Sequence, residues 1–86
     1  VRTLNRPASN ITAPTVPHPA AAHLGVKVAR SVTRHVRTLA EMLDGPIAAR
    51  RVDVRDRYIL AAAGITCQDG PNLHLTDDGR ALAVQL

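Results

Sequence analysis

The sequence contains no phenylalanine and no tryptophan, and Tyr58 is its only aromatic residue. Aromatic side chains bury large areas in protein cores, whereas alanine, which supplies much of the apolar content here, buries little. A chain of 86 residues has room for one domain, and small domains bury a low fraction of their surface. We therefore expect a thin core that holds no deep substrate cavity and gains stability from packing against a partner.

Cysteine is almost absent, since Cys67 is the only one. A single cysteine excludes an internal disulfide framework and a multi-cysteine metal site, and we expect Cys67 to be a small buried apolar side chain. The histidines are scattered, and none stands three or four residues from another strong ligand on a predicted helix, so we expect no metal and no other cofactor. They are His18, His23, His35 and His74, and His35 borders the apolar face of a predicted helix.

Catalytic groups are missing too. The sequence offers no nucleophile with a base and an orienting group and no Gly-rich phosphate loop, and Asp77 and Asp78 stand at a predicted helix start, where the helix dipole stabilises them. No apolar run approaches the roughly 20 residues that span a bilayer, and no secretory signal pattern begins the sequence. We therefore expect a non-enzymatic protein with no membrane segment, located in the cytoplasm or within a viral particle.

Positive charge is what the sequence does have. Eleven Lys and Arg residues against seven acids give a net charge of +4 and a pI near 10.6. Residues 24–43 carry four cations and one acid, whereas residues 65–86 carry one cation and three acids. This distribution favours association with a polyanion or an acidic surface through the N-terminal side.

Residues 1–23 differ from the rest in having four of the six prolines and no apolar periodicity. Proline fixes φ and removes a backbone donor, so we expect an extended or disordered arm, and residues 24–86 as the folded domain. Such an arm could follow DNA or bind a protein partner. Its prolines are Pro7, Pro14, Pro17 and Pro19.

Residues 24–43 have the clearest periodicity. Apolar residues at steps of three and four predict a helix of about five turns. Cations follow the same steps on the opposite face and form a stripe about 15 Å long, which suits either phosphate tracking or an ordinary solvated surface. The apolar residues are Leu24, Val28, Val32, Val36, Leu39 and Leu43, and the opposite face carries Lys27, Arg30, Arg34, Arg37 and Glu41.

Residues 44–64 predict two further helices. Asp44, Gly45 and Pro46 end the long helix, and a short helix over residues 47–51 follows. Asp53 is a helix N-cap with Asp56 three residues later. Val54, Tyr58 and Ala61 are spaced for the buried face of this helix, which Gly64 ends as a left-handed C-cap.

Residues 65–86 predict a β-hairpin and a last helix. Residues 65–68 and 73–76 alternate in character around the turn formers 69–72, which is typical of a hairpin. Ile65, Cys67, Leu73 and Leu75 are then expected on the face toward the helices. Thr76 is the expected N-cap of the final helix.

Residues 57–82, RYILAAAGITCQDGPNLHLTDDGRAL, resemble the part of winged helix-turn-helix proteins that runs from the recognition helix through the wing into the next helix. The shared pattern is Ala63, Gly64 and Ile65 before the hairpin, and Leu75, Thr76 and Gly79 after it. The resemblance implies a mainly α domain with a small β-hairpin (α+β), in which three helices precede the wing. The helix over residues 47–51 is short for this family, and the wing tip lacks the Arg or Lys that wings often carry.

The resemblance also implies that the helix beginning at Asp53 enters the major groove of duplex DNA. Arg50, Arg51 and Arg55 would then pair with guanine or phosphate, and Arg57 with a backbone phosphate. Asp53 and Asp56 would face the same surface, or else cap the helix and pair with Arg57 or Arg50.

Two functions remain open at this point. The first is a non-catalytic DNA-binding regulator or accessory factor, for which a homodimer is possible. It would use the arginines above and the cations Lys27, Arg30, Arg34 and Arg37. The alternative is a structural or interaction protein of a viral particle or larger assembly, tethered by residues 1–23. A basic surface suits both.

Overall fold

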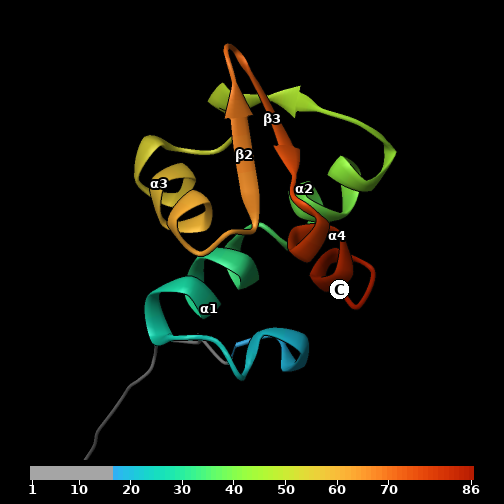
Figure 1. Ribbon diagram of the computed structural model, residues 1–86. Helices are drawn as coiled ribbons and strands as arrows, with labels where there is room; N and C mark the ends of the chain where they lie inside the picture. Colours follow the sequence, from blue (N-terminus) through green and yellow to red (C-terminus); the bar gives the residue numbers. More distant parts are fainter. Residues whose placement is uncertain (1–16) are drawn as a thin grey trace, which may run out of the picture.

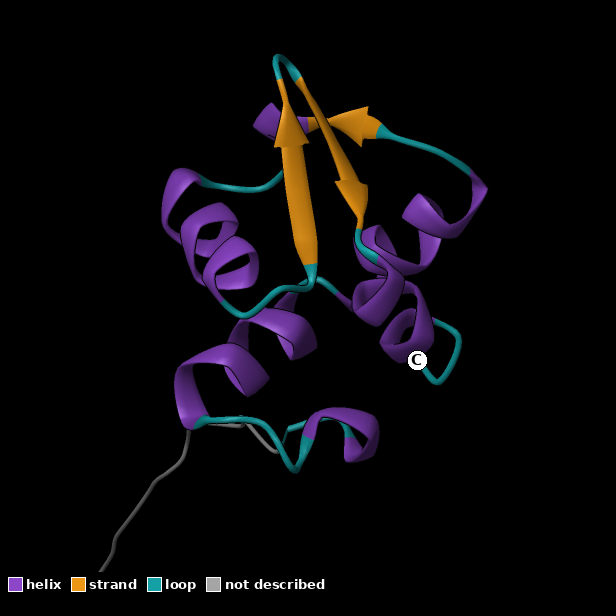
Figure 2. Ribbon diagram, in the orientation of Figure 1, coloured by secondary structure: helices purple, strands orange, loops and turns teal. Residues whose placement is uncertain are grey.

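The computed structural model describes residues 17–86. Residues 1–16, most of the predicted arm, lie outside the described part. The described chain is mainly helical with one small antiparallel sheet, which confirms the predicted α+β class (Figures 1 and 2). In order, the elements are the 3₁₀ turn η2 (Pro19–Ala21), α1 (Val26–Arg34), α2 (Val36–Glu41), the 3₁₀ turn η3 (Met42–Asp44), β1 (Ile47–Ala48), the 3₁₀ turn η4 (Ala49–Arg51), α3 (Val54–Ala62), β2 (Thr66–Asp69), β3 (Asn72–Leu75) and α4 (Asp77–Ala83).

The sheet has the strand order β1-β3-β2, so β3 lies in the middle and pairs antiparallel with both neighbours. In Figure 1, α3 lies on one side of the β2–β3 hairpin and α2 and α4 on the other, with α1 beneath α3. Among residues 17–86, no helix has both the length and the apolar character to cross a bilayer. The core between these elements includes the fully buried side chains Val32, Leu39, Met42, Val52, Leu60 and Leu73.

The predicted five-turn helix is broken at His35, so the prediction of one continuous helix is wrong. His35 adopts φ −116° and ψ 26°, outside the helical range, and separates α1 from α2. Its N–H is shared between the carbonyls of Ser31 and Val32, and its side chain bonds to Asp56 on α3. Thr33 also donates its hydroxyl to the Ala29 carbonyl, a back-bond that weakens helices. The cation stripe is therefore interrupted after Arg34.

Residues 47–51 do not form the predicted short helix. Ile47 and Ala48 are the strand β1 and pair with Leu73 and Asn72, and only Ala49–Arg51 make a single 3₁₀ turn. The Ala49 N–H donates to the Pro71 carbonyl at the hairpin tip. Pairing with the hairpin satisfies this backbone better than one isolated helical turn would.

Helix α3 buries a different face from the predicted one. Val54 and Tyr58 are 71% and 76% exposed, and Ala61 is exposed as well. The buried side chains are Asp56 and Leu60, which stand four residues apart on one face. Asp56 is held by α1, and this contact sets the rotation of the helix.

The end of α3 confirms the predicted C-cap. Gly64 has φ +76° and its N–H donates to the Ala61 carbonyl, while the Ile65 N–H donates to the Leu60 carbonyl. This pair of bonds is the Schellman motif, and the buried side chains of Leu60 and Ile65 supply the apolar contact that accompanies it. The reversal leads the chain directly into β2.

The hairpin forms with the predicted turn, but its register exposes Cys67, contrary to our expectation. Thr66 pairs with Leu75, and Cys67 pairs with His74. Cross-strand partners point to the same side of the sheet, so Thr66, Leu73 and Leu75 face the core and Cys67 faces away from it.

The start of α4 is attached to the end of α3 through backbone contacts. Thr76 is the N-cap, as predicted, and accepts a bond from the Gly79 N–H at 3.0 Å. The Thr76 N–H donates to the Ile65 carbonyl, and its hydroxyl donates to the Gly64 carbonyl. Gly79 packs directly on this strand start, because a Cβ at Gly79 would overlap the Ile65 carbonyl oxygen.

Candidate nucleic-acid interface

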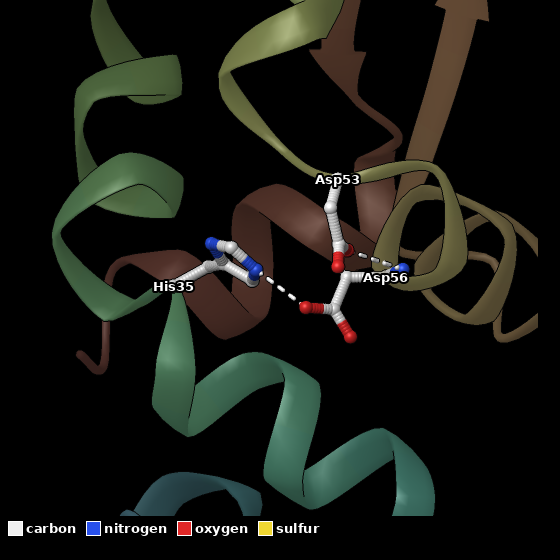
Figure 3. Close-up of side chains that lie close together, drawn as sticks. All are labelled: His35, Asp53 and Asp56. Carbon is white, nitrogen blue, oxygen red and sulfur yellow. Dashed lines mark hydrogen bonds and ion pairs between the residues drawn. The ribbon is translucent and has the colours of Figure 1, made fainter.

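The Asp56 carboxylate joins α3 to α1. It is buried, and the guanidinium of Arg34 donates to both of its oxygens, at 2.7 and 2.8 Å. The Ser31 hydroxyl donates to one oxygen at 2.8 Å, and Nε2 of His35 lies 2.7 Å from the other (Figure 3). Asp53 caps the helix, as predicted, by accepting the Asp56 N–H at 2.9 Å. We call Ser31, Arg34, His35 and Asp56 the Asp56 network.

The predicted pairing of Asp56 with Arg57 or Arg50 is wrong. Arg57 instead donates its Nε to the Val52 carbonyl at 2.9 Å and approaches Gln68 at 3.5 Å. The reason is orientation, since Asp56 points toward α1 and Arg57, the next residue, points toward the hairpin.

The Asp56 network keeps its carboxylate ionised. Burial alone would raise the pKa of Asp56, but hydrogen bonds from Arg34, His35 and Ser31 outweigh burial and hold that pKa well below its usual range. Charge-assisted hydrogen bonds are short and directional, so several of them on one carboxylate constrain how the two helices are oriented. The network therefore presets the geometry between α1 and α3.

A second arrangement involves atoms that could bind a metal ion. A ring nitrogen of His35 and carboxylate oxygens of Asp53 and Asp56 lie within 4.8 Å of one another (Figure 3). Arg34 already occupies both Asp56 oxygens, and one Asp53 oxygen accepts from the helix backbone. A cation would have to displace a guanidinium of like charge. The donors present fit an ion-pair network better than a metal centre.

Stability should depend on pH through this carboxylate. The usual pKa of an unfolded aspartate is about 3.9, above that of folded Asp56, so the unfolded chain binds more protons in acid. The stabilisation is complete above about pH 5 and is lost as the pH falls below about 4. Asp56→Asn should thus cost about 2 kcal/mol of unfolding free energy at neutral pH. The difference from wild type should shrink on acidification, as measured by urea unfolding from pH 7 to pH 2.

The matched control is Asp69→Asn, which removes an exposed carboxylate at the end of β2. It should change the unfolding free energy by less than about 0.5 kcal/mol at every pH. A constant difference between Asp56→Asn and wild type across the pH range would contradict the assignment of an ionised Asp56.

A cleft of about 410 Å³ lies between α1 and α3, directly beside the Asp56 network. Four of the eight predicted nucleic-acid-binding residues line it: Lys27, Arg30 and Arg34 from α1 and Arg55 from α3. Arg34 is neutralised by Asp56. Among residues 17–86, Lys27, Arg30 and Arg55 have no ion-pair partner, and all of them are exposed. We call these three residues the cleft cations.

The other four predicted residues lie outside this cleft. Arg37 follows the helix break and belongs to α2. Arg50 and Arg51 are in the 3₁₀ turn η4, where Arg51 forms an ion pair with Glu41 at 2.7 Å. Arg57 is half-buried beside the hairpin. The structure therefore divides one predicted basic surface into a cleft and separate arginines.

Sequence reasoning missed the Asp56 network and the exposure of Tyr58. The only local signal for the network was the position of Asp56, four residues before Leu60 and therefore on the helix face that a core leucine must bury.

The chain matches no family model, no curated protein and no solved structure.

Proposed function

We propose that this chain is a non-catalytic DNA-binding module of the winged-helix type, a small regulator or accessory factor. The observation that carries the proposal is the grouping of Lys27, Arg30 and Arg55, from two helices, around one cleft, where none of the three forms an ion pair with a described residue. The cleft also contains two carboxylates, Asp56, which pairs with Arg34, and Asp53, which caps α3, so its excess charge is positive. Cations on a rigid scaffold neutralise phosphates and release counterions, which is the main source of affinity for duplex DNA.

The Asp56 network supports this proposal because it fixes the spacing of the cleft cations. Lys27 and Arg30 are on α1, Arg55 is on α3, and Asp56 holds α1 to α3 through Arg34 and Ser31. Contacts to phosphate fix the register and orientation of a protein on the duplex. The network therefore holds the helices that carry the cations at a fixed distance.

The roles of the residues in the resemblance also support it. Gly64 reverses the chain into the hairpin, Leu75 is buried against the helices, and Thr76 and Gly79 attach α4 to Ile65.

One part departs from the family pattern. Helix α3 packs on α1, while the helix that would precede it in a helix-turn-helix is reduced to the turn η4. The proposal therefore gives α1 a direct part in the DNA contact.

Salt dependence tests the proposal. The whole chain is titrated into a labelled duplex of about 20 base pairs at several salt concentrations, and binding is followed by fluorescence anisotropy. The logarithm of the affinity should fall linearly with the logarithm of salt, with a slope of about −3 for three phosphate contacts. Poly-glutamate of equal charge is the control, and equal affinity for it would show general attraction to polyanions. Absence of binding near about 100 mM salt would contradict the proposal.

A further inference from the structure

The outward face of α3 is apolar where an exposed helix normally carries polar side chains. Val54 and Tyr58 are both more than 70% exposed, and Ala61 and Ala62 continue the same face one turn beyond Tyr58. These four residues, which we call the α3 stripe, follow helical steps of three and four. Exposed apolar side chains that gather on one face indicate a contact surface.

Cations border the α3 stripe on both sides. A hollow of about 400 Å³ on one side of Tyr58 includes Lys27 and Arg55, and a hollow of about 270 Å³ on the other side includes Arg57. Neither lining contains an acid. The surface is thus an apolar strip between positive borders, and two of the cleft cations, Lys27 and Arg55, form one border.

This arrangement matches a DNA major groove. The groove is about 12 Å wide with phosphates along both edges, and an α-helix such as α3, about 10–12 Å in diameter with its side chains, fits within it. The N-terminal residues of a recognition helix contact the base edges. Of the stripe residues, Val54 is the first residue of α3, and Tyr58 lies one turn further along the same face. The only apolar group that bases present in the major groove is the 5-methyl group of thymine.

The polar side chains that read other bases are scarce on this face. Asparagine and glutamine, which pair with adenine, are absent from α3. Asp53 accepts the Asp56 N–H, and Arg55 lies at the border of the stripe, where it also lines the cleft between α1 and α3. Resting on the DNA-binding function proposed above, we infer that the α3 stripe recognises thymine methyl groups, so that the chain prefers A·T-rich duplexes.

The test compares duplexes that differ only in these methyl groups. The whole chain is titrated into alternating A·T, A·U and G·C deoxyribonucleotide duplexes of equal length, at about 100 mM salt. Each buried methyl contributes roughly a factor of four to affinity, so two contacts predict about 15-fold weaker binding to the A·U duplex than to A·T. The G·C duplex, which also lacks the methyl group, should bind no better than A·U.

Substitutions then assign the effect to the stripe. Val54→Ser with Tyr58→Ser should retain binding but reduce the ratio of A·T to A·U affinity to about one. Val84→Ser, at a 69% exposed valine that is the C-cap of α4, is the matched control and should keep the full ratio. Circular dichroism checks that each variant is folded.

Three results would overturn the inference. Equal wild-type affinity for A·T and A·U would remove it while leaving DNA binding intact. An unchanged ratio of A·T to A·U affinity in the Val54→Ser, Tyr58→Ser variant would also overturn the inference. If sedimentation shows that wild type self-associates and this variant does not, the stripe is a protein contact. Failure to bind any duplex would instead reject the proposed function itself.

Discussion

Gly79→Ala is expected to destabilise the fold by about 3 kcal/mol, although alanine is the better helix former by about 1 kcal/mol. Gly79 lies inside α4 with helical backbone, so its conformational freedom is not the reason. A Cβ at this position would overlap the Ile65 carbonyl oxygen and approach its carbon to 2.8 Å. Both neighbours are backbone atoms, which cannot rotate away, so α4 must move off the hairpin.

That movement would also break the bonds from Thr76 to the Gly64 and Ile65 carbonyls. A domain of this size has a total stability of roughly 5 kcal/mol, so the variant should unfold at a much lower urea concentration. Gly25→Ala is the control, because a Cβ at Gly25 has no neighbour within 4 Å. It should cost less than about 1 kcal/mol. Equal stability of the two variants in urea unfolding would refute the close approach of α4 to Ile65.

Removing the cleft cations should have the largest effect on function. Lys27→Gln, Arg30→Gln and Arg55→Gln together should weaken duplex binding by about 100-fold at roughly 100 mM salt, because each lost cation leaves one phosphate with its counterion. All three side chains are exposed, and surface substitutions of this kind change stability by less than about 0.5 kcal/mol each. The circular dichroism spectrum of the variant should therefore match that of wild type.

The control removes the same charge elsewhere. Arg37, Arg50 and Arg80 are exposed and do not line the cleft. Changing all three to glutamine should weaken binding by only a few fold through the lower net charge. If the control loses as much affinity as the cleft variant, net charge and not the cleft determines binding.

Local signals in the sequence predicted the start and end of α3 and the start of α4. Asp53, Gly64 and Thr76 each satisfy backbone groups within a few residues, so their roles depend little on the rest of the chain. The turn between residues 69 and 72 is similarly local.

Long-range contacts explain what was missed. The break at His35 and the rotation of α3 both depend on Asp56, which is 21 residues from His35 in the chain. Apolar spacing favoured burial of Val54 and Tyr58, but the charge-assisted bonds of Asp56 to α1 outweigh it. Cys67 faces outward because strand register, and not residue character, decides the face.

The candidate site was predicted only as a collection of cations. All eight basic residues could be read from the sequence, but their grouping could not. Arg55 joins Lys27 and Arg30 because α3 packs on α1, and Arg51 is withdrawn by Glu41. Each of these facts depends on tertiary contacts between segments separated in the chain.

The most direct test of the central claim, that the cleft cations bind DNA phosphates, is the salt dependence of duplex binding by wild type and the triple cleft variant. The slope of log affinity against log salt should be less steep by about three units in the variant, since each phosphate contact contributes about 0.9. The control at Arg37, Arg50 and Arg80 should keep the wild-type slope. Parallel lines for wild type and the cleft variant would contradict the account.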